Sequence, residues 1–244
     1  MNKLDHIDEF RRALKGYHLS KVALQTLSQT KLILLVAPTS SGRNTIIREL
    51  LKTGDYHFIV SDTTRQPRMN DGVMEQNGQE YWFRSELEML QDIKDGKYLE
   101  AAVIHNQQVA GVSIRELEAA TEEQKIAITD IEVDGADNAH KYKPDTIAIF
   151  VLPPSFEEWQ RRLKHRGYME PKEFVRRMTS AADEFEIALN QDFYRFVVNG
   201  SVERAAITIN QIAKLDEVDI SLQKQGRQLA EQLLLETRIF LAKT

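Results

Sequence analysis

The sequence predicts an α/β protein in which a mostly parallel sheet carries helices on both faces. Short apolar runs rich in β-branched residues alternate with amphipathic segments of helical period, as in successive βαβ units. A strand, a glycine-containing turn and a helix also follow one another across residues 31–51, and such sheets bind ligands at the carboxyl ends of their strands. A strand-rich piece, residues 62–112, interrupts the alternation and predicts an inserted subdomain.

The bulk composition is that of an ordinary globular protein. The 244 residues suit one large domain or one domain with additions, and the net charge of −5 disfavours a general nucleic-acid binder. The absence of cysteine excludes disulfides and cysteine-ligated zinc. The N-terminus lacks the apolar core of a signal peptide, and the apolar run 32–37 is too short to span a bilayer. We therefore expect a cytoplasmic protein that contacts neither membrane nor nucleic acid.

The first half of the chain begins with a polar helical extension, residues 1–30, that carries a thin apolar stripe. A buried strand follows at 31–37, and a helix opens near residue 46. Further strands are predicted at 57–61, 80–83, 98–103 and 108–110. The helix predicted at 86–94 is preceded by Ser85, which has capping-box spacing to Glu88.

The second half contains two more buried parallel strands, at 126–131 and 146–152. Ser155 and Glu158 predict a capping box for a helix to about residue 166, and Pro171 is expected at the first position of a helix to about 190. A last strand at 193–198 and helices at 202–215 and 217–242 follow, with Gly226 expected to weaken the final helix. The terminal helices either mediate a homo-oligomer or cover the core.

The turn at residues 38–45 has the position of a Walker A loop, G-x-x-x-x-G-K-[ST], but only Gly42 matches. Such a loop binds an anion because successive backbone N–H groups converge at a helix N-terminus. Arg43 keeps the charge of the usual lysine on a bulkier group, and the Asn44 amide replaces a hydroxyl that ligates Mg²⁺. The predicted phosphate-binding residues are Ser40, Ser41, Gly42, Arg43, Asn44 and Thr45. The plainer interpretation is a strand-to-helix turn that binds no nucleotide.

A second phosphate-binding segment is predicted at residues 61–68, SDTTRQPR. Pro67 restricts its own φ and pushes Gln66 toward an extended conformation, so the loop is stiff. Its two arginines, Arg65 and Arg68, can grip one phosphate with paired N–H donors. The alternative is a solvated basic turn.

The chain resembles the guanylate kinase family over about residues 31–213. Residues 61–68 are similar to S-x-T-T-R-x-P-R, residues 78–83 (GQEYWF) to G-x-D-Y-x-F, 98–100 (YLE) to F-L-E and 129–136 (TDIEVDGA) to L-D-I-D-x-Q-G-A. Residues 149–155 resemble I-F-I-x-P-P-S, 161–167 and 176–178 the arginine-bearing lid, and 197–199 V-V-N. The resemblance implies a P-loop NTPase-type parallel sheet flanked by helices, a GMP-binding insert at 62–112 and a helical lid at 155–178. Residues 1–30 and 214–244 are extensions.

The resemblance also implies roles on the acceptor side. Arg65, Arg68 and Tyr81 hold the GMP phosphate, while Ser61, Glu100 and Glu132 face guanine, whose N1–H and 2-amino edge suits a carboxylate. One departure lies in the loop 105–113, where Ala110 takes the place of a phosphate-binding tyrosine. Ser113 is the candidate substitute if that loop is shifted.

On the donor side the resemblance implies that catalysis depends on Arg43, Arg162, Arg166 and Arg177, with Asp130 and Asn44 holding Mg²⁺. Arg162 and Arg166 lie four residues apart and share one helix face. The predicted activity is transfer of the ATP γ-phosphoryl group to GMP. The alternative is an inactive module that binds GMP or a phosphorylated peptide, because the donor loop is altered at Ala37, Arg43 and Asn44 while the acceptor arginines are kept.

Overall fold

The computed structural model describes residues 4–70, 72–165, 169–215 and 218–244. The chain divides into two compact units. Unit 1 contains the residues up to Lys31, His57–Ala127 and Asn138–Pro144, and unit 2 contains Leu32–Tyr56, Ile128–Asp137 and the chain from Asp145 onward.

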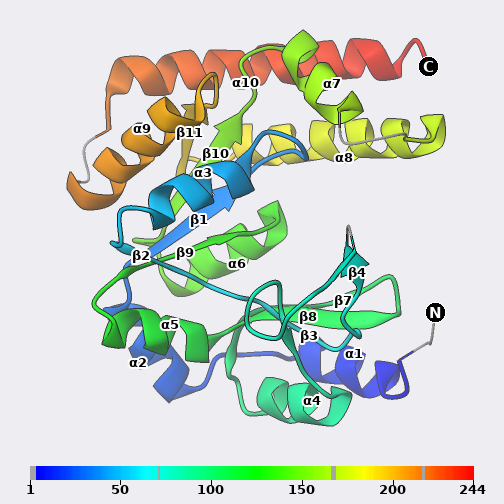
Figure 1. Cartoon of the computed structure of the whole chain (residues 1–244), viewed down its shortest axis with the longest axis vertical. Coiled ribbons are helices and arrows are strands. Elements are labelled where there is room, and N and C mark those ends of the chain that lie inside the picture. The colour runs from blue at the N-terminus through cyan, green and yellow to red at the C-terminus, as the bar shows by residue number, and fades with distance from the viewer. Residues whose placement is uncertain (1–3, 71, 166–168, 216–217) are drawn as a thin grey trace. The chain divides into compact units, whose positions relative to one another are not determined.

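Figure 1 labels most of the elements. The helices are α1 (Ile7–Lys15), α2 (Lys21–Gln29), α3 (Arg43–Leu51), α4 (Glu86–Lys94), α5 (Ile114–Glu122), α6 (Val133–Tyr142), α7 (Phe156–Lys164), α8 (Pro171–Leu189), α9 (Val202–Leu215) and α10 (Ile220–Leu241). The strands are β1 (Leu32–Val36), β2 (Tyr56–Phe58), β3 (Asp62–Thr63), β4 (Met69–Asn70), β5 (Val73–Met74), β6 (Trp82–Phe83), β7 (Tyr98–Ile104), β8 (Gln108–Ser113), β9 (Ile126–Asp130), β10 (Ile147–Leu152) and β11 (Tyr194–Val198).

A five-stranded sheet in the order β11-β10-β1-β9-β2 confirms the predicted α/β class. Strand β10 pairs in parallel with both β1 and β11. Every residue of β1 and β10 is buried, as expected of strands covered on both faces. The loop that follows β1 therefore starts from the rigid centre of the sheet.

Helix α10 packs along α8 and over β11 within unit 2 (Figure 1). Gly226 does not simply weaken this helix, because a Cβ there would lie 2.7 Å from the Cβ of Phe196 on β11. The amide of Gln223 accepts from the Phe196 N–H at 2.8 Å and donates to its carbonyl at 3.2 Å. These bonds satisfy an edge strand that would otherwise expose its backbone.

Unit 1 contains a second sheet, in the order β6-β3-β8-β7. The predicted N-terminal helical extension is two helices, and α1 packs on α4 and β7 through a buried cluster that includes Leu4, Phe10 and Met89. The Tyr17 hydroxyl accepts from the Tyr98 backbone N–H at 2.7 Å. The extension is therefore part of the core of this unit.

Several element boundaries differ from the sequence prediction. Helix α3 begins at Arg43, because Gly42 in the left-handed region serves as its N-cap. The capping box of α4 is complete, and Pro171 opens α8 as predicted. At α7 the Ser155 side chain caps the helix, whereas the Glu158 carboxylate binds Arg161 and Arg162 instead of closing the box.

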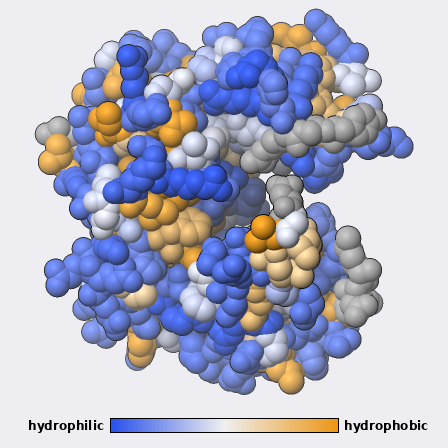
Figure 2. All heavy atoms as spheres, viewed as in Figure 1, coloured by the Kyte–Doolittle hydropathy of each residue, from blue (hydrophilic) through white to orange (hydrophobic). Residues whose placement is uncertain are grey.

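The face of the molecule seen in Figure 2 is mostly hydrophilic, with apolar residues in separate groups. Among the described helices, none has both the length and the apolar character needed to cross a bilayer.

Candidate functional site

The phosphate-loop candidate in unit 2 has the backbone of an anion site. It leaves the buried strand β1 and enters α3 at Gly42, whose φ is +99°. Ser40 also has a positive φ, +67°, although it carries a side chain. No side chain caps the N-terminus of α3, so its first N–H groups point toward the loop. Such an arrangement favours an anion.

A cavity of about 510 Å³ lies over this loop. Loop residues 38–45, including all six predicted phosphate-binding residues, line it together with Asp130, Arg162, Asn199, Gly200 and Val202. Within the described chain, the hydroxyls of Ser40 and Ser41 are buried without a hydrogen-bond partner. Unpartnered buried hydroxyls at an anion-type loop are available to a ligand.

The Arg43 side chain extends toward the end of β9. Its guanidinium donates to the Ile131 carbonyl at 2.9 Å and lies 4.0 Å from the Asp130 carboxylate. To contact a phosphate in the loop as predicted, the Arg43 side chain has to leave the Ile131 carbonyl. If it stays there, the backbone N–H groups of the loop bind the phosphate instead.

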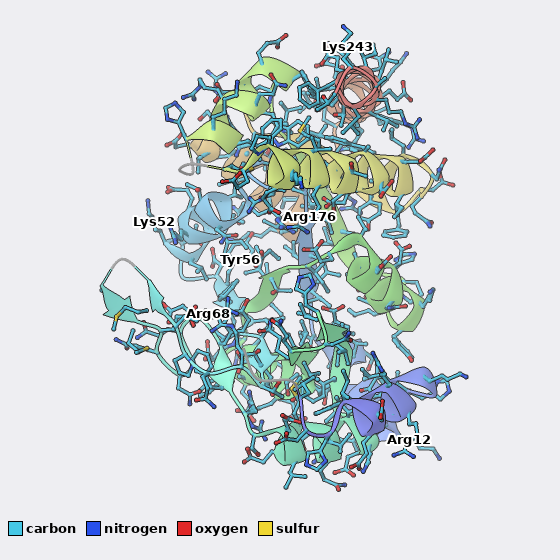
Figure 3. All side chains as sticks on the ribbon, turned by 90° about the vertical axis from the view of Figure 1, so that its right-hand side faces the viewer. Arg12, Lys52, Tyr56, Arg68, Arg176 and Lys243 are labelled. Carbon is cyan, nitrogen blue, oxygen red and sulfur yellow. The ribbon has the colours of Figure 1, made fainter. Side chains whose placement is uncertain are left out.

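The predicted arginines of α7 and α8 differ in their surroundings. Arg162 lines the cavity, and it donates to the Asn199 carbonyl at 3.0 Å and to Glu158 at 2.8 Å. Arg177 binds Glu173 on its own helix at 2.8 Å and does not line the described cavity. Its neighbour Arg176, labelled on α8 in Figure 3, also binds Glu173. Arg166 lies outside the described residues.

Sequence reasoning missed Asn199 as a loop residue. Its side chain is 2% exposed and donates to the Ser41 carbonyl at 2.8 Å. The available signals were its place directly after the last strand of the sheet, where polar residues gather at the carboxyl edge, and the resemblance of residues 197–199 to V-V-N. Asn199 therefore fixes the loop from the neighbouring strand end.

In unit 1 the side chains of Glu75 and Tyr81 hold the predicted acceptor arginine, Arg65. Its guanidinium forms a bidentate pair with Glu75, at 2.5 and 2.9 Å, and lies over the Tyr81 ring at 4.7 Å. Glu75 also accepts from the Arg68 backbone N–H at 2.9 Å. Only 10% of the Arg65 side chain is exposed. The structure thus brings Arg65 and Tyr81 together, as predicted, and adds Glu75, which no motif indicated.

The remaining acceptor residues of unit 1 surround this pair. Arg68 is exposed on the loop before hairpin β4–β5 (Figure 3), and both arginines line a cavity of about 710 Å³. Ser61 and Glu100 are half-buried, the latter on β7. Glu132, the third predicted guanine contact, belongs to unit 2 and is exposed. The predicted acceptor set is therefore divided between the two units.

The predicted loop 105–113 is mostly a strand. A turn with positive φ at His105 and Asn106 joins β7 to β8, and Ala110 pairs with Thr63 of β3. Ser113 is buried as the N-cap of α5, where its hydroxyl accepts from Arg115 N–H. Ser113 thus has a structural role, so this register does not make it a substitute phosphate ligand.

An additional titratable group in unit 2 is Glu184 on α8. Burial, and after it the nearby charges of Glu132 and Asp183, raise the pKa of Glu184 to about 7, against the opposite effects of Ser180 and Arg43. The folded state therefore binds a proton at Glu184 more tightly than the unfolded chain does.

Replacing Glu184 with glutamine is expected to stabilise the protein at alkaline pH. The wild-type chain loses stability as pH rises from about 4.5 through about 7, because the buried carboxyl must ionise. Thermal unfolding from pH 4 to pH 9 measures this: the variant should match the wild type at pH 4 and melt higher at pH 8. The control is Asp192→Asn, which removes an exposed carboxylate of the same unit, and an unchanged pH profile in Glu184→Gln would contradict the expectation.

Comparison with known proteins identifies relatives over most of the chain. The family model described as guanylate kinase matches residues 29–215. The chain is 32% identical over 192 residues to "Guanylate kinase" of Corynebacterium jeikeium, covering 78% of this chain and 99% of the relative. It is 33% identical over 190 residues to "Guanylate kinase 1" of Oryza sativa, covering 77% of this chain and 48% of that protein. The chain thus spans about half the length of the plant relatives.

A solved structure resembles the fold. The crystal structure of guanylate kinase from Anaplasma phagocytophilum aligns with a TM-score of 0.56 and 26% identity, covering 83% of this chain and 94% of that chain. Helices α1 and α10 lie outside the region that the family model matches.

Proposed function

Because this chain belongs to the guanylate kinase family, we propose that it transfers the γ-phosphoryl group of ATP to the phosphate of GMP, giving ADP and GDP. The observation that carries the proposal is the pair of anion sites: a phosphate loop under an open cavity in unit 2 and two arginines beside a cavity in unit 1. Phosphoryl transfer depends chiefly on positioning and on positive charge around the moving group.

Each unit supplies part of the chemistry. In unit 2 the backbone N–H groups of residues 40–45 bind the donor phosphates, and Arg162 adds positive charge at the wall of the same cavity. Arg43, Arg166 and Arg177 are the further cations assigned to the transferred group. In unit 1, Arg65, Arg68 and Tyr81 bind the GMP phosphate, and the hydroxyl or carboxylate groups of Ser61 and Glu100 face guanine. The family resemblance also assigns a guanine contact to Glu132, which belongs to unit 2.

Magnesium fits the groups at the donor loop. Mg²⁺ in phosphate enzymes takes one or two protein oxygens and fills its other positions with water and substrate phosphate. The Asp130 carboxylate, one-third exposed in the loop cavity, and the Asn44 amide, exposed on the first turn of α3, supply such oxygens. Bound there, the ion would neutralise phosphate charge. Among the described residues there is no cluster of three or more carboxylates or histidines that could hold a metal alone.

The test is a coupled assay of GDP and ADP formation from ATP and GMP. We expect Mg²⁺-dependent turnover and loss of activity on chelation. AMP should be a poorer acceptor by about 10⁴-fold, because it leaves a guanine-reading carboxylate unpaired. A folded protein that forms no GDP at millimolar substrates contradicts the proposal.

The binding-only alternative is not favoured. The relatives that match over most of their length are named as the enzyme, and the altered loop keeps its positive-φ residues, its open helix N-terminus and its cavity. Backbone geometry, which carries most phosphate binding in such loops, is thus retained despite the changed side chains.

A further inference from the structure

The phosphate loop contains a residue in an unfavourable conformation. Ser40 has a φ of +67°, in the left-handed region that is unfavourable for a residue with a side chain. Such a conformation persists only where the surrounding structure determines it. The strained backbone at Ser40 therefore depends on hydrogen bonds from other parts of the structure.

Two side chains from other elements bind the carbonyls on either side of Ser40. The indole Nε1–H of Trp159 on α7 donates to the Thr39 carbonyl at 2.8 Å. The amide of Asn199, after β11, donates to the Ser41 carbonyl at 2.8 Å. Trp159 is 0% exposed and Asn199 2% exposed, so water does not compete for either bond.

Trp159 is itself fixed by aromatic packing. Its ring makes edge contacts with Phe156 at 6.1 Å and Phe185 at 5.8 Å between centroids. Phe156 contacts Phe240 of α10 at 6.3 Å, so a helix outside the family match supports the Trp159 side of the loop. One turn further along α7, Arg162 binds the Asn199 carbonyl. Helix α7 thus connects to both bonds that hold the loop.

We propose that Trp159 is a positioning residue for the donor nucleotide, whose indole N–H holds the Thr39 carbonyl so that the N–H groups of the loop converge on a polyphosphate. The proposal rests on the proposed function in one respect, namely that the loop binds the phosphates of ATP. We expect a ligand in the loop to change the environment of the Thr39 carbonyl, so the Trp159 indole N–H reports binding through that hydrogen bond.

The chain provides a direct readout, because it contains only two tryptophans. The other, Trp82, donates to Glu116 within unit 1 and serves as the internal reference. Protein labelled with ¹⁵N at the indoles gives two resonances, and Trp82→Phe assigns them. Titration with Mg²⁺ and a non-hydrolysable ATP analogue should shift the Trp159 indole resonance far more than that of Trp82.

Calorimetry on the same sample separates the positioning role of Trp159 from the proposed function. Analogue binding with an unmoved Trp159 indole resonance overturns the positioning role and leaves the proposed function intact. No analogue binding at millimolar concentration contradicts the proposed function and, with it, this inference. The wild-type protein is used for both measurements, so neither outcome depends on a variant that folds poorly.

A variant tests the mechanism. Trp159→Phe keeps an aromatic ring and removes the donor, and we expect a rise of about tenfold in the ATP dissociation constant with little change for GMP. The matched control is Phe185→Leu, which disturbs the same aromatic packing at Trp159 but leaves the Nε1 bond in place. If Phe185→Leu weakens ATP binding as much as Trp159→Phe does at an equal loss of melting temperature, the effect is general destabilisation and the proposal fails.

Discussion

Replacing Gly42 with alanine is expected to weaken donor binding strongly. The φ of Gly42 is +99°, and a Cβ there would lie 2.2 Å from the Nδ2 atom of Asn199. Because Asn199 holds the Ser41 carbonyl, relief of this clash moves the loop itself. A displacement of about 1 Å at a catalytic group costs on the order of 100-fold in rate, and we expect at least that loss in kcat/KM for ATP.

The same cavity offers a matched control for this substitution. Gly200 also lines it, but a Cβ at Gly200 would meet only the Cβ of Pro154, at the ordinary distance of 3.9 Å. Gly200→Ala should therefore retain near-normal kinetics. Steady-state kinetics and ATP-analogue calorimetry on both variants make the comparison. Equal activity of Gly42→Ala and the wild type would show that the loop does not bind the donor phosphates.

Replacing Arg65 with alanine is expected to reduce kcat/KM for GMP by about 100-fold or more. Each charge-assisted hydrogen bond to the phosphate contributes about 1.5–3 kcal/mol, and guanidinium can make two. The substitution also leaves the Glu75 carboxylate without its bidentate partner, so its negative charge repels the incoming phosphate. Initial-rate kinetics at varied GMP measures the loss, with calorimetry for GMP binding.

The controls for Arg65→Ala address stability and general charge. Arg12→Ala removes an exposed arginine of α1 in the same unit and should leave the kinetics unchanged. Arg65→Lys keeps the charge but cannot reproduce the planar paired donors, so its activity should lie well below that of the wild type. A folded Arg65→Ala protein with an unchanged KM for GMP and unchanged turnover contradicts the assignment of the acceptor phosphate.

The α/β class could be predicted because it depends on local patterns. The runs 32–36 and 147–152 are apolar throughout, and only a sheet covered on both faces accommodates them. Capping at Ser85 and the proline start of α8 are likewise signals confined to a few residues. The short strand Asp62–Thr63 was not predicted, since pairing with β6 and β8 rather than intrinsic propensity defines it.

In the candidate site, too, local sequence patterns determined some features and the tertiary structure determined the others. The sequence by itself determined that a glycine turn follows the first strand and that two arginines flank Pro67, because both are fixed by neighbours along the chain. Only the tertiary structure decided that Glu75 pairs with Arg65, that Ser113 caps a helix, and that Trp159 and Asn199 hold the loop around Ser40. The bonds at the loop join residues more than 100 positions apart, and their energies exist only once the sheet and α7 have brought the partners together.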